Sequence, residues 1–180
     1  MLRVPLVHED LGPPVEIEAE RLEPSAFGAL YEKHRLPVYR YLRARTNSDA
    51  DALDLAATTF ERAFTNLGRF RRRDGGVQAW LLRIARNAAI DAQRRRRPTV
   101  DLAGADAQLG RIAIEADRAH GQSVEILDLV ARLPNDQREA LLLRYAGGLS
   151  AREIGFVIGK REGAVQKQIE RGLAALREAF

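Results

Sequence analysis

Apolar residues recur at helical spacing along most of the chain, and this pattern predicts a series of amphipathic helices. Between residues 27 and 42 the apolar positions fall three or four apart, as they do on one face of a helix. Pro37 lies inside this segment and should kink or loosen the helix, because proline lacks a backbone N–H. Ser48, with Asp51 three residues later, is typical of a capped helix start. The second helix should then run to Leu67.

A third helix is expected after an arginine- and glycine-rich loop at residues 68–76. Its apolar residues, from Val77 to Ala88, share one face, and its arginines fall largely elsewhere on the circumference. We expect this helix to end near Arg97. The residue before a proline, here Pro98, is disfavoured in the helical conformation.

The segments on either side of these three helices indicate the domain boundaries. Residues 1–23 contain three prolines and no helical periodicity, so we interpret them as a loose tail. Residues 98–122 are poor in large apolar side chains and rich in Ala, Asp and Gly, which is typical of a linker. The sequence therefore predicts two small helical domains, 24–97 and 123–180, joined by a flexible acidic linker.

The second domain should begin with two short helices. An apolar stripe over 124–133 ends at Pro134. Asn135 or Asp136 can cap the helix that follows. This helix should end at the glycine pair 147–148, because glycine is common just past the end of a helix.

Residues 150–176 carry the most specific local pattern. Ser150 and Glu153 form a capping box for a short helix, Gly159 supplies a tight turn, and a second helix should open near Glu162. Gly155 stands where only a small side chain permits the two helices to cross closely. This spacing predicts a helix-turn-helix, although an ordinary helical hairpin with a glycine turn has the same spacing. The residues expected to pack the two helices together are Ile154, Ile158, Val165 and Ile169.

Composition favours an all-α fold and excludes several kinds of site. Ala, Leu, Arg and Glu dominate, and all four favour helices. The chain has no cysteine, so it has neither a disulfide framework nor a thiolate zinc site. Its three histidines are scattered and form no metal or nucleophile constellation. Because the sequence offers no such site, we expect no cofactor and no enzymatic activity. The longest apolar stretches are only a few residues, so we also expect no membrane insertion. A cytoplasmic protein is the default expectation.

The charge is unevenly distributed along the chain. Residues 68–98 contain ten Arg against two Asp, whereas residues 1–24 and 99–128 each contain two Arg against six acidic residues. A basic block between acidic flanks is a plausible site for a polyanion, because arginines gain affinity by displacing the counterions of phosphates. A solvated helix face would give the same charge run.

Several longer strings occur in a fixed order along the chain, and Ala79 to Asn87 is the most specific of them. The ordered series resembles regions 2 and 4 of the extracytoplasmic-function group of bacterial sigma factors, over about 25–97 and 125–178. The remaining strings are Phe27 to His34, Val38 to Leu42, Asp51 to Leu55, Thr59 to Phe64, Asp91 with the Arg94 to Arg97 run, Leu133-Pro134, Arg138 to Tyr145, Gly148 to Ser150, Glu153-Ile154, Gly163 to Val165 and Leu173 to Arg177.

The resemblance implies that the first domain binds core RNA polymerase through its clamp helices, and reads and melts the −10 element of promoter DNA. An aromatic ring for stacking, an amide for base edges and arginines for a single strand suit that role. Trp80 also lies in the apolar stripe, so a core position fits this residue equally well. The residues implied for the polymerase are Asp51, Asp54, Thr58, Glu61 and Phe64; those implied for the −10 element are Arg71, Arg72, Arg73, Trp80, Arg83, Arg86, Asn87 and Arg94.

The resemblance further implies that the second domain docks on the polymerase flap and reads the −35 element. The chain departs from the family pattern here, with Ala164 in place of the usual threonine, Gly155 in place of alanine, and few arginines late in the reading helix. Many factors of this group bind an anti-sigma factor, which is a further expected partner. The implied reading residues are Arg161, Glu162, Gln166, Lys167, Gln168 and Arg171.

Two other functions remain open from the sequence. A helix-turn-helix activator with an unrelated first domain accounts for residues 134–177 but leaves 51–97 unexplained. A sigma-like regulator that no longer initiates transcription would account for the departures from the family pattern.

Overall fold

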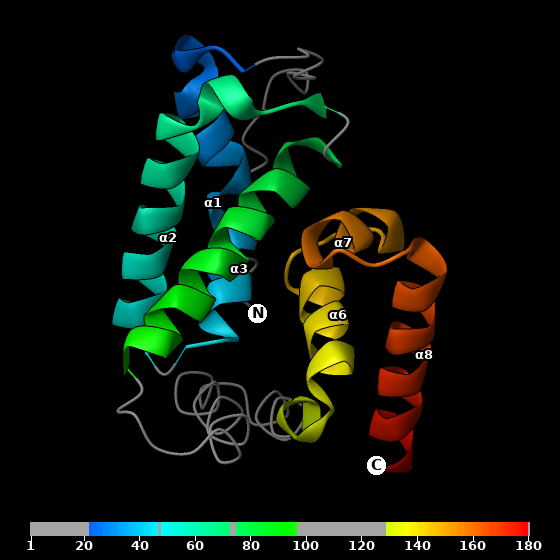
Figure 1. Ribbon diagram of the computed structural model, residues 1–180. Helices are drawn as coiled ribbons and strands as arrows, with labels where there is room; N and C mark the ends of the chain where they lie inside the picture. Colours follow the sequence, from blue (N-terminus) through cyan, green and yellow to red (C-terminus); the bar gives the residue numbers. More distant parts are fainter. Residues whose placement is uncertain (1–21, 47, 73–74, 97–128, 180) are drawn as a thin grey trace, which may run out of the picture.

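The computed structural model describes residues 22–46, 48–72, 75–96 and 129–179. Within these ranges every regular element is a helix (Figure 1), which confirms the all-α prediction. We call residues 22–96 the N-terminal bundle and residues 129–179 the C-terminal bundle. Their helices are η1 (Pro24–Ala26), α1 (Phe27–Arg43), α2 (Asp49–Thr65), η2 (Leu67–Arg69) and α3 (Gly76–Arg96), then α6 (Asn135–Tyr145), α7 (Ala151–Ile158) and α8 (Glu162–Glu178).

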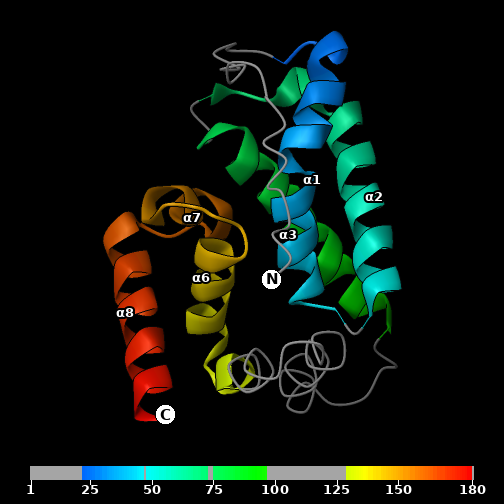
Figure 2. The same ribbon diagram turned by 180° about the vertical axis from the view of Figure 1, so that it is seen from behind.

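The N-terminal bundle packs α1 and α2 side by side, with α3 across them (Figures 1 and 2). The apolar face of α1 is fully enclosed at Leu30, Val38 and Leu42. Leu22 is also buried in this core, so the last part of the predicted tail belongs to the fold. Residues 1–21 of that tail and the whole predicted linker lie outside the described residues.

Helix α1 runs unbroken from Phe27 to Arg43 with Pro37 inside it. Pro37 therefore does not end the helix, and the predicted kink at this position stays a prediction. A proline in a helix interior costs about 3 kcal/mol, but Leu30 on one side of it and Val38 and Tyr41 on the other are completely buried. Their burial stabilises the helical path by more than the lost hydrogen bond costs.

The helix starts follow the sequence in two of three cases. Ser48 accepts a hydrogen bond from the Asp51 backbone N–H at the start of α2, as predicted. Ser150 and Glu153 form the predicted capping box at the start of α7. Helix α6 differs, because its N-cap is Pro134 and no side chain caps it.

The helix-turn-helix geometry is present in the C-terminal bundle. Gly159 has a φ of 72°, in the left-handed region that the turn requires. A Cβ added to Gly155 would lie 2.5 Å from the Lys160 carbonyl oxygen, so this glycine lets α7 approach the turn that follows it. A Cβ added to Gly172 would lie 2.8 Å from Leu141 Cδ1, so α8 crosses α6 closely at that point.

The two bundles pack against each other, with α3 of the first in contact with α7 of the second (Figure 1). Buried apolar residues of both belong to one continuous cluster. The sequence had suggested two domains joined by a flexible linker, and periodicity could not show that their surfaces fit together. In the part of the chain that the structure describes, no helix is both long enough and apolar enough to cross a membrane.

His34 lies buried within the N-terminal bundle, as expected for a packed residue on the apolar stripe of α1. Burial, with a smaller contribution from the charge of Lys33, lowers its pKa from 6.5 to about 4. A hydrogen bond with Gln78 acts in the opposite direction but is weaker. The ring is therefore neutral at neutral pH.

We predict that His34 makes the fold acid-sensitive. Since its pKa is lower in the folded than in the unfolded chain, the unfolded chain takes up the proton first. The free energy of unfolding should fall as the pH drops from 6.5 to about 4, by up to about 3 kcal/mol. Urea titrations across this range should show a smaller decline for His34→Gln than for the wild type; parallel curves would contradict the prediction.

Candidate nucleic-acid and polymerase interface

The predicted polymerase-binding residues share one side of α2. Asp51, Asp54, Thr58 and Glu61 are spaced three and four apart, which places them along one helical stripe. The side chains of Asp54 and Glu61 are exposed, and those of Asp51 and Thr58 are half-buried. The stripe ends at Phe64, whose side chain is 52% exposed. The structure thus brings all five predicted residues onto a single accessible surface.

Aromatic side chains extend this surface onto α1. Phe27 meets Phe64 edge to face with ring centroids 5.0 Å apart, and Tyr31 meets Phe60 at 4.7 Å. Tyr31 and Leu53 are 42% and 58% exposed, although both belong to the helical apolar pattern. That pattern identified them as apolar but gave no signal that they would remain uncovered. An exposed apolar patch of this kind is typical of a protein-binding surface.

Three of the predicted −10 residues lie on one side of α3. Arg83, Arg86 and Asn87 are separated by three and four positions, so their side chains share a face. Asn87 is exposed. The Arg83 guanidinium lies 5.0 Å from the centroid of the Phe156 ring of α7. Arg86 is partly covered, at a position that faces the C-terminal bundle.

Trp80 belongs to the core in this structure. Its side chain is 8% exposed and packs edge to face on Phe70, with ring centroids 5.3 Å apart. In this conformation the indole is covered, so Trp80 is not available to stack on a base, and its predicted contact with the −10 element stays a prediction. Its position in the apolar stripe of the sequence had favoured the core equally.

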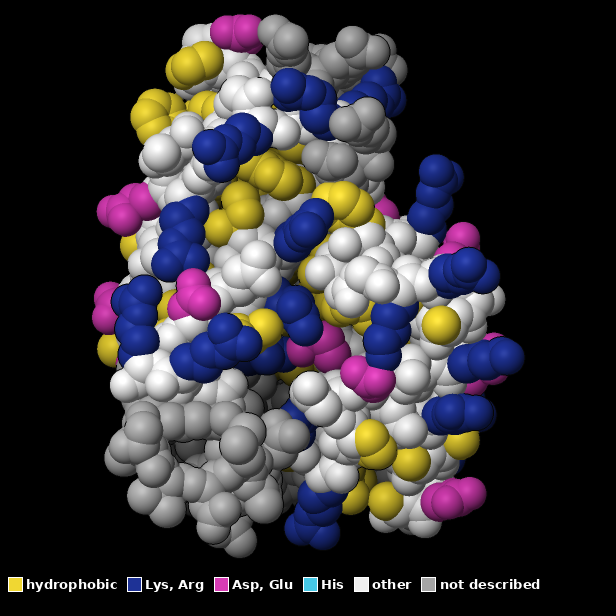
Figure 3. Space-filling view, viewed as in Figure 1, with side chains coloured by type: hydrophobic (Ala, Val, Ile, Leu, Met, Phe, Trp, Pro, Cys, Tyr) yellow, Lys and Arg dark blue, Asp and Glu magenta, His cyan; other side chains and the backbone are white. Residues whose placement is uncertain are grey.

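The remaining −10 arginines are not gathered at one point. Arg71 is held against the loop by hydrogen bonds from its Nη1 to the carbonyl oxygens of Gly68 and Phe70, at 2.8 and 2.7 Å. Arg72 and Arg94 are exposed, but they lie near opposite ends of α3, separated by its length of about 30 Å. Arg73 lies outside the described residues. Lys and Arg side chains are spread over both bundles on the face shown in Figure 3.

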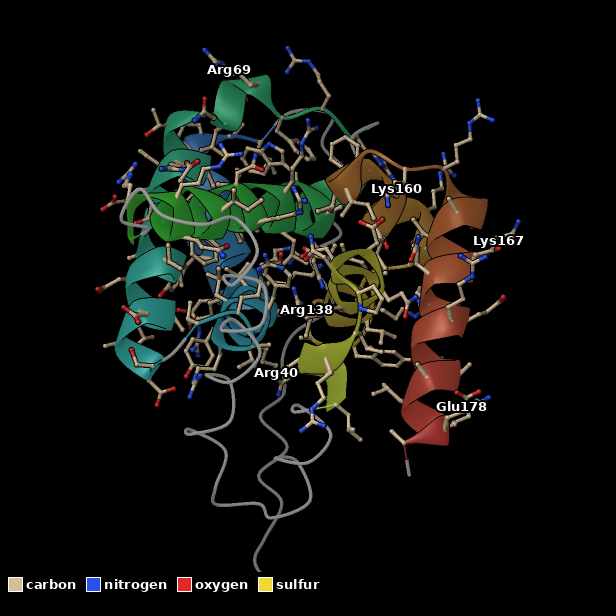
Figure 4. The ribbon with its side chains drawn as sticks, turned by 60° about the horizontal axis from the view of Figure 1, so that its bottom comes forward. Arg40, Arg69, Arg138, Lys160, Lys167 and Glu178 are labelled. Atoms are coloured by element: carbon tan, nitrogen blue, oxygen red, sulfur yellow. The ribbon has the colours of Figure 1, made fainter. Side chains whose placement is uncertain are left out.

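The predicted −35 residues lie on and just before α8. Arg161, Glu162, Gln166, Lys167 and Arg171 are exposed, and Gln168 is half-buried. The opposite side of the helix is closed by Val165 and Gly172, which are buried. Figure 4 shows Lys167 on α8, at the outer edge of the C-terminal bundle. The reading helix is therefore free on the side that a major groove would occupy.

The structure also contains a buried carboxylate that the sequence did not single out. Glu139 of α6 is 5% exposed. Its Oε1 accepts a 2.6 Å hydrogen bond from the Tyr41 hydroxyl, and its Oε2 pairs with Arg45. Arg86 Nε lies 3.4 Å from Oε1, close enough for an ion pair but without hydrogen-bond geometry. Nothing in the sequence marks this glutamate, because its partners are 53 or more residues away along the chain.

Protonation of Tyr41 is favoured by its surroundings. Burial, above all, raises the pKa of its hydroxyl well above the usual value, and the neighbouring Glu139 raises it further. The hydroxyl therefore remains a hydrogen-bond donor to the carboxylate throughout the neutral range. Among the described residues, no group of His, Asp and Glu side chains forms a metal site.

Two segments of the chain match known families. Residues 30–99 match Sigma-70 region 2, and residues 123–176 match Sigma-70 region 4. The matches cover the N-terminal bundle from within α1 and the C-terminal bundle almost to the end of α8.

Named relatives cover most of the chain. ECF RNA polymerase sigma factor SigD of Mycobacterium tuberculosis is 32% identical, with 94% of this chain and 88% of SigD aligned. ECF RNA polymerase sigma factor BldN of Streptomyces coelicolor is 34% identical over 88% of this chain, which spans 61% of the length of BldN. The solved structure of CnrH in complex with the cytosolic domain of CnrY is similar with a TM-score of 0.65 and 25% identity, covering 87% of this chain and 88% of that chain.

We predict that Trp80→Ala destabilises the N-terminal bundle by about 3–5 kcal/mol, the usual cost of removing a large buried aromatic side chain. Asn87→Ala, on the exposed side of the same helix, should change stability by less than about 0.5 kcal/mol. Chemical denaturation of both variants measures the difference. A Trp80→Ala variant as stable as the wild type would place the indole outside the core.

Proposed function

The chain belongs to the extracytoplasmic-function group of sigma factors, which direct RNA polymerase to promoters, and we propose which of its surfaces carry out each step. The observation that carries the proposal is the placement of three surfaces on separate helices. A mixed acidic and aromatic surface lies on α2, a basic and amide stripe on α3, and an exposed reading helix is formed by α8.

The surface of α2 is proposed to bind the clamp helices of core RNA polymerase. Its exposed Asp54 and Glu61 offer carboxylates to a basic partner, and Phe64 and Leu53 offer apolar area beside them. An interface with an apolar centre and charged surroundings is the usual composition of such contacts.

The stripe of α3 is proposed to hold the melted −10 strand. The amide of Asn87 suits a base edge, and the guanidinium groups of Arg83 and Arg86 suit the phosphates of a single strand. Trp80 has a different role in this proposal, because its buried ring fixes the helix against Phe70. Arg71 would shape the preceding loop through its two carbonyl contacts.

Helix α8 is proposed to read the −35 element in the major groove. Gln166 and Arg171 can bond to base edges, and Lys167 can neutralise a phosphate. Helix α8 presents few arginines beyond Arg171, so this contact should be the weaker of the two. Core polymerase would hold the two bundles at a fixed spacing. Once one bundle has bound its promoter element, the other bundle then meets its own element at a high effective concentration.

An anti-sigma factor is a proposed further partner, as the resemblance to the family implies; the similar protein CnrH was itself solved in complex with another protein, the cytosolic domain of CnrY. The proposal also places the chain in the cytoplasm, where RNA polymerase works.

Run-off transcription with purified chain, sigma-free core polymerase and a genomic fragment library tests this function. New promoter-specific transcripts that require the chain are expected. Binding to core without transcripts would instead favour the regulator that does not initiate. DNA binding without core binding would favour the conventional helix-turn-helix activator.

We predict that Asn87→Ala lowers promoter opening by about tenfold while leaving core binding unchanged, because one base contact is worth about 1–3 kcal/mol. Permanganate footprinting of the −10 region reports the opening. Gln93→Ala removes an amide six residues further along the same helix, beyond the stripe of Arg83, Arg86 and Asn87, and should open promoters normally. An equal loss in both variants would contradict the assignment of Asn87.

For the polymerase surface, we predict that Asp54→Ala weakens binding to core polymerase by about tenfold, the loss of one charge-assisted contact of about 1.5 kcal/mol. The fold should be intact, because Asp54 is exposed. Fluorescence anisotropy of the labelled chain measures the affinity. Glu178→Ala removes an exposed carboxylate from the far end of α8 and serves as control; identical affinities for the two variants would exclude Asp54 from the interface.

A further inference from the structure

Helix α3 carries a carboxylate on the exposed side that is proposed to hold DNA. Asp91 follows Asn87 by four residues and precedes Arg94 by three, a spacing that places the three side chains on one line along the helix. Arg83 lies on the same line, four residues before Asn87. Arg83, Asn87 and Arg94 are exposed, and the side chain of Asp91 is 43% exposed. The order along the line is therefore a guanidinium, an amide, a carboxylate and a second guanidinium.

A guanidinium from the neighbouring helix holds this carboxylate. Arg62 of α2 donates a hydrogen bond from its Nη1 to Oδ2 of Asp91 at 3.2 Å. Oδ1 takes no part in this bond. Because both side chains are more than one third exposed, an ion pair of this kind contributes little to the stability of the fold. Its main consequence is that it orients the carboxylate of Asp91 beside Asn87.

A carboxylate at this position is unfavourable for a phosphate. Lys and Arg side chains lie over α2 and α3 on the face shown in Figure 3, and these groups attract a polyanion. The carboxylate of Asp91 instead repels phosphate, and it can accept hydrogen bonds but not donate them. The donors that DNA offers are on its bases. A strand that lies along α3 is therefore best accommodated with its phosphates near Arg83 or Arg94 and a base turned towards Asp91.

The chemistry of the acceptor indicates which base fits. The amino group of cytosine donates to a carboxylate in the usual pairing of Asp or Glu with a base. Thymine carries a carbonyl oxygen in place of this amino group, so it would set one acceptor against another. Asp91 should therefore favour cytosine over thymine.

We propose that Asp91 is a specificity-determining residue, which accepts a hydrogen bond from the amino group of a cytosine next to the base that Asn87 contacts. Arg62 is its positioning residue, contributed by the helix that is proposed to bind polymerase. The inference rests on the proposed role of α3 in binding the −10 strand. It adds to that role a contact with a base from a residue four positions beyond Asn87.

The preference can be measured on the free full-length chain, because the line is exposed in this structure. Two short fluorescein-labelled single strands serve as probes, one of deoxycytidylates and one of thymidylates, which have the same backbone charge. Fluorescence anisotropy should show tighter binding of the cytosine strand by the wild type. In Asp91→Ala the ratio of the two affinities should fall about fivefold, the value of one hydrogen bond. No preference in the wild type, or an unchanged ratio in the variant, would overturn the proposal.

Charge alone is controlled by a carboxylate in a similar pair elsewhere. Glu32 accepts a 2.9 Å hydrogen bond from Arg35 on α1, where both side chains are exposed. Glu32→Ala removes the same charge as Asp91→Ala, so it should change the affinities for both strands alike and leave their ratio unaltered. A ratio that falls equally in the two variants would show an effect of charge and would overturn the role of Asp91.

The positioning role of Arg62 has its own test. Arg62→Ala should lower the ratio of the two affinities, because the carboxylate loses the partner that orients it. Arg62→Lys keeps a cation beside Asp91 and should restore the ratio in part. A ratio equal to that of the wild type in Arg62→Ala would remove Arg62 from the proposal.

Transcription separates this inference from the proposed function. Run-off transcripts from a pool of promoters with a randomised −10 element can be sequenced for the wild type and for Asp91→Ala. The variant should lose a preference for cytosine at one position, next to the position affected in Asn87→Ala. Lower output with the same base preferences would overturn the reading role of Asp91. If the wild-type chain made no transcripts, the proposed function would fail, whereas the ratio of strand affinities would still decide whether Asp91 distinguishes bases.

Discussion

Helix α3 packs against its own bundle on one side and against the C-terminal bundle on another, and the arrangement of the whole molecule depends on these two contacts. Leu81, Leu82 and Ala85 are inaccessible to water, because α1 and α2 cover one side of the helix and the C-terminal bundle covers another. A helix with two covered sides keeps only a narrow exposed strip. In this chain that strip carries Arg83 and Asn87, and Arg83 also lies against Phe156 of the second bundle.

The contact between the bundles combines an apolar part with a polar part. The apolar contact between Leu82 and Gly147 depends only on the close fit of the two surfaces. Glu139 requires specific partners, and it finds them in Tyr41 and Arg45. Because both parts involve α3 or the end of α1, the surface proposed for promoter DNA adjoins the contact between the bundles.

Two departures from the family pattern have local structural causes. Gly155 replaces an alanine where the carbonyl of Lys160 comes within 2.5 Å of a would-be Cβ. Gly172 takes a place in α8 that lies directly on Leu141, so a longer side chain could not occupy it without displacing the Leu141 side chain. Few arginines occur late in the reading helix, and at one of these late positions, Gly172, burial against α6 excludes contact with DNA.

The sequence by itself determined the helices, their caps at Ser48 and Ser150, and the turn at Gly159. These features depend on neighbours within a few residues, which periodicity and capping chemistry describe well. It also assigned most of the proposed polymerase, −10 and −35 residues to segments that the structure shows to be helical. What covers each helix face was decided only by the tertiary structure. Periodicity shows which residues share a face, but burial depends on segments far away in the sequence. Pro37 inside a continuous helix, Trp80 in the core, Tyr31 and Leu53 at the surface, and Glu139 between the bundles all follow from such distant contacts.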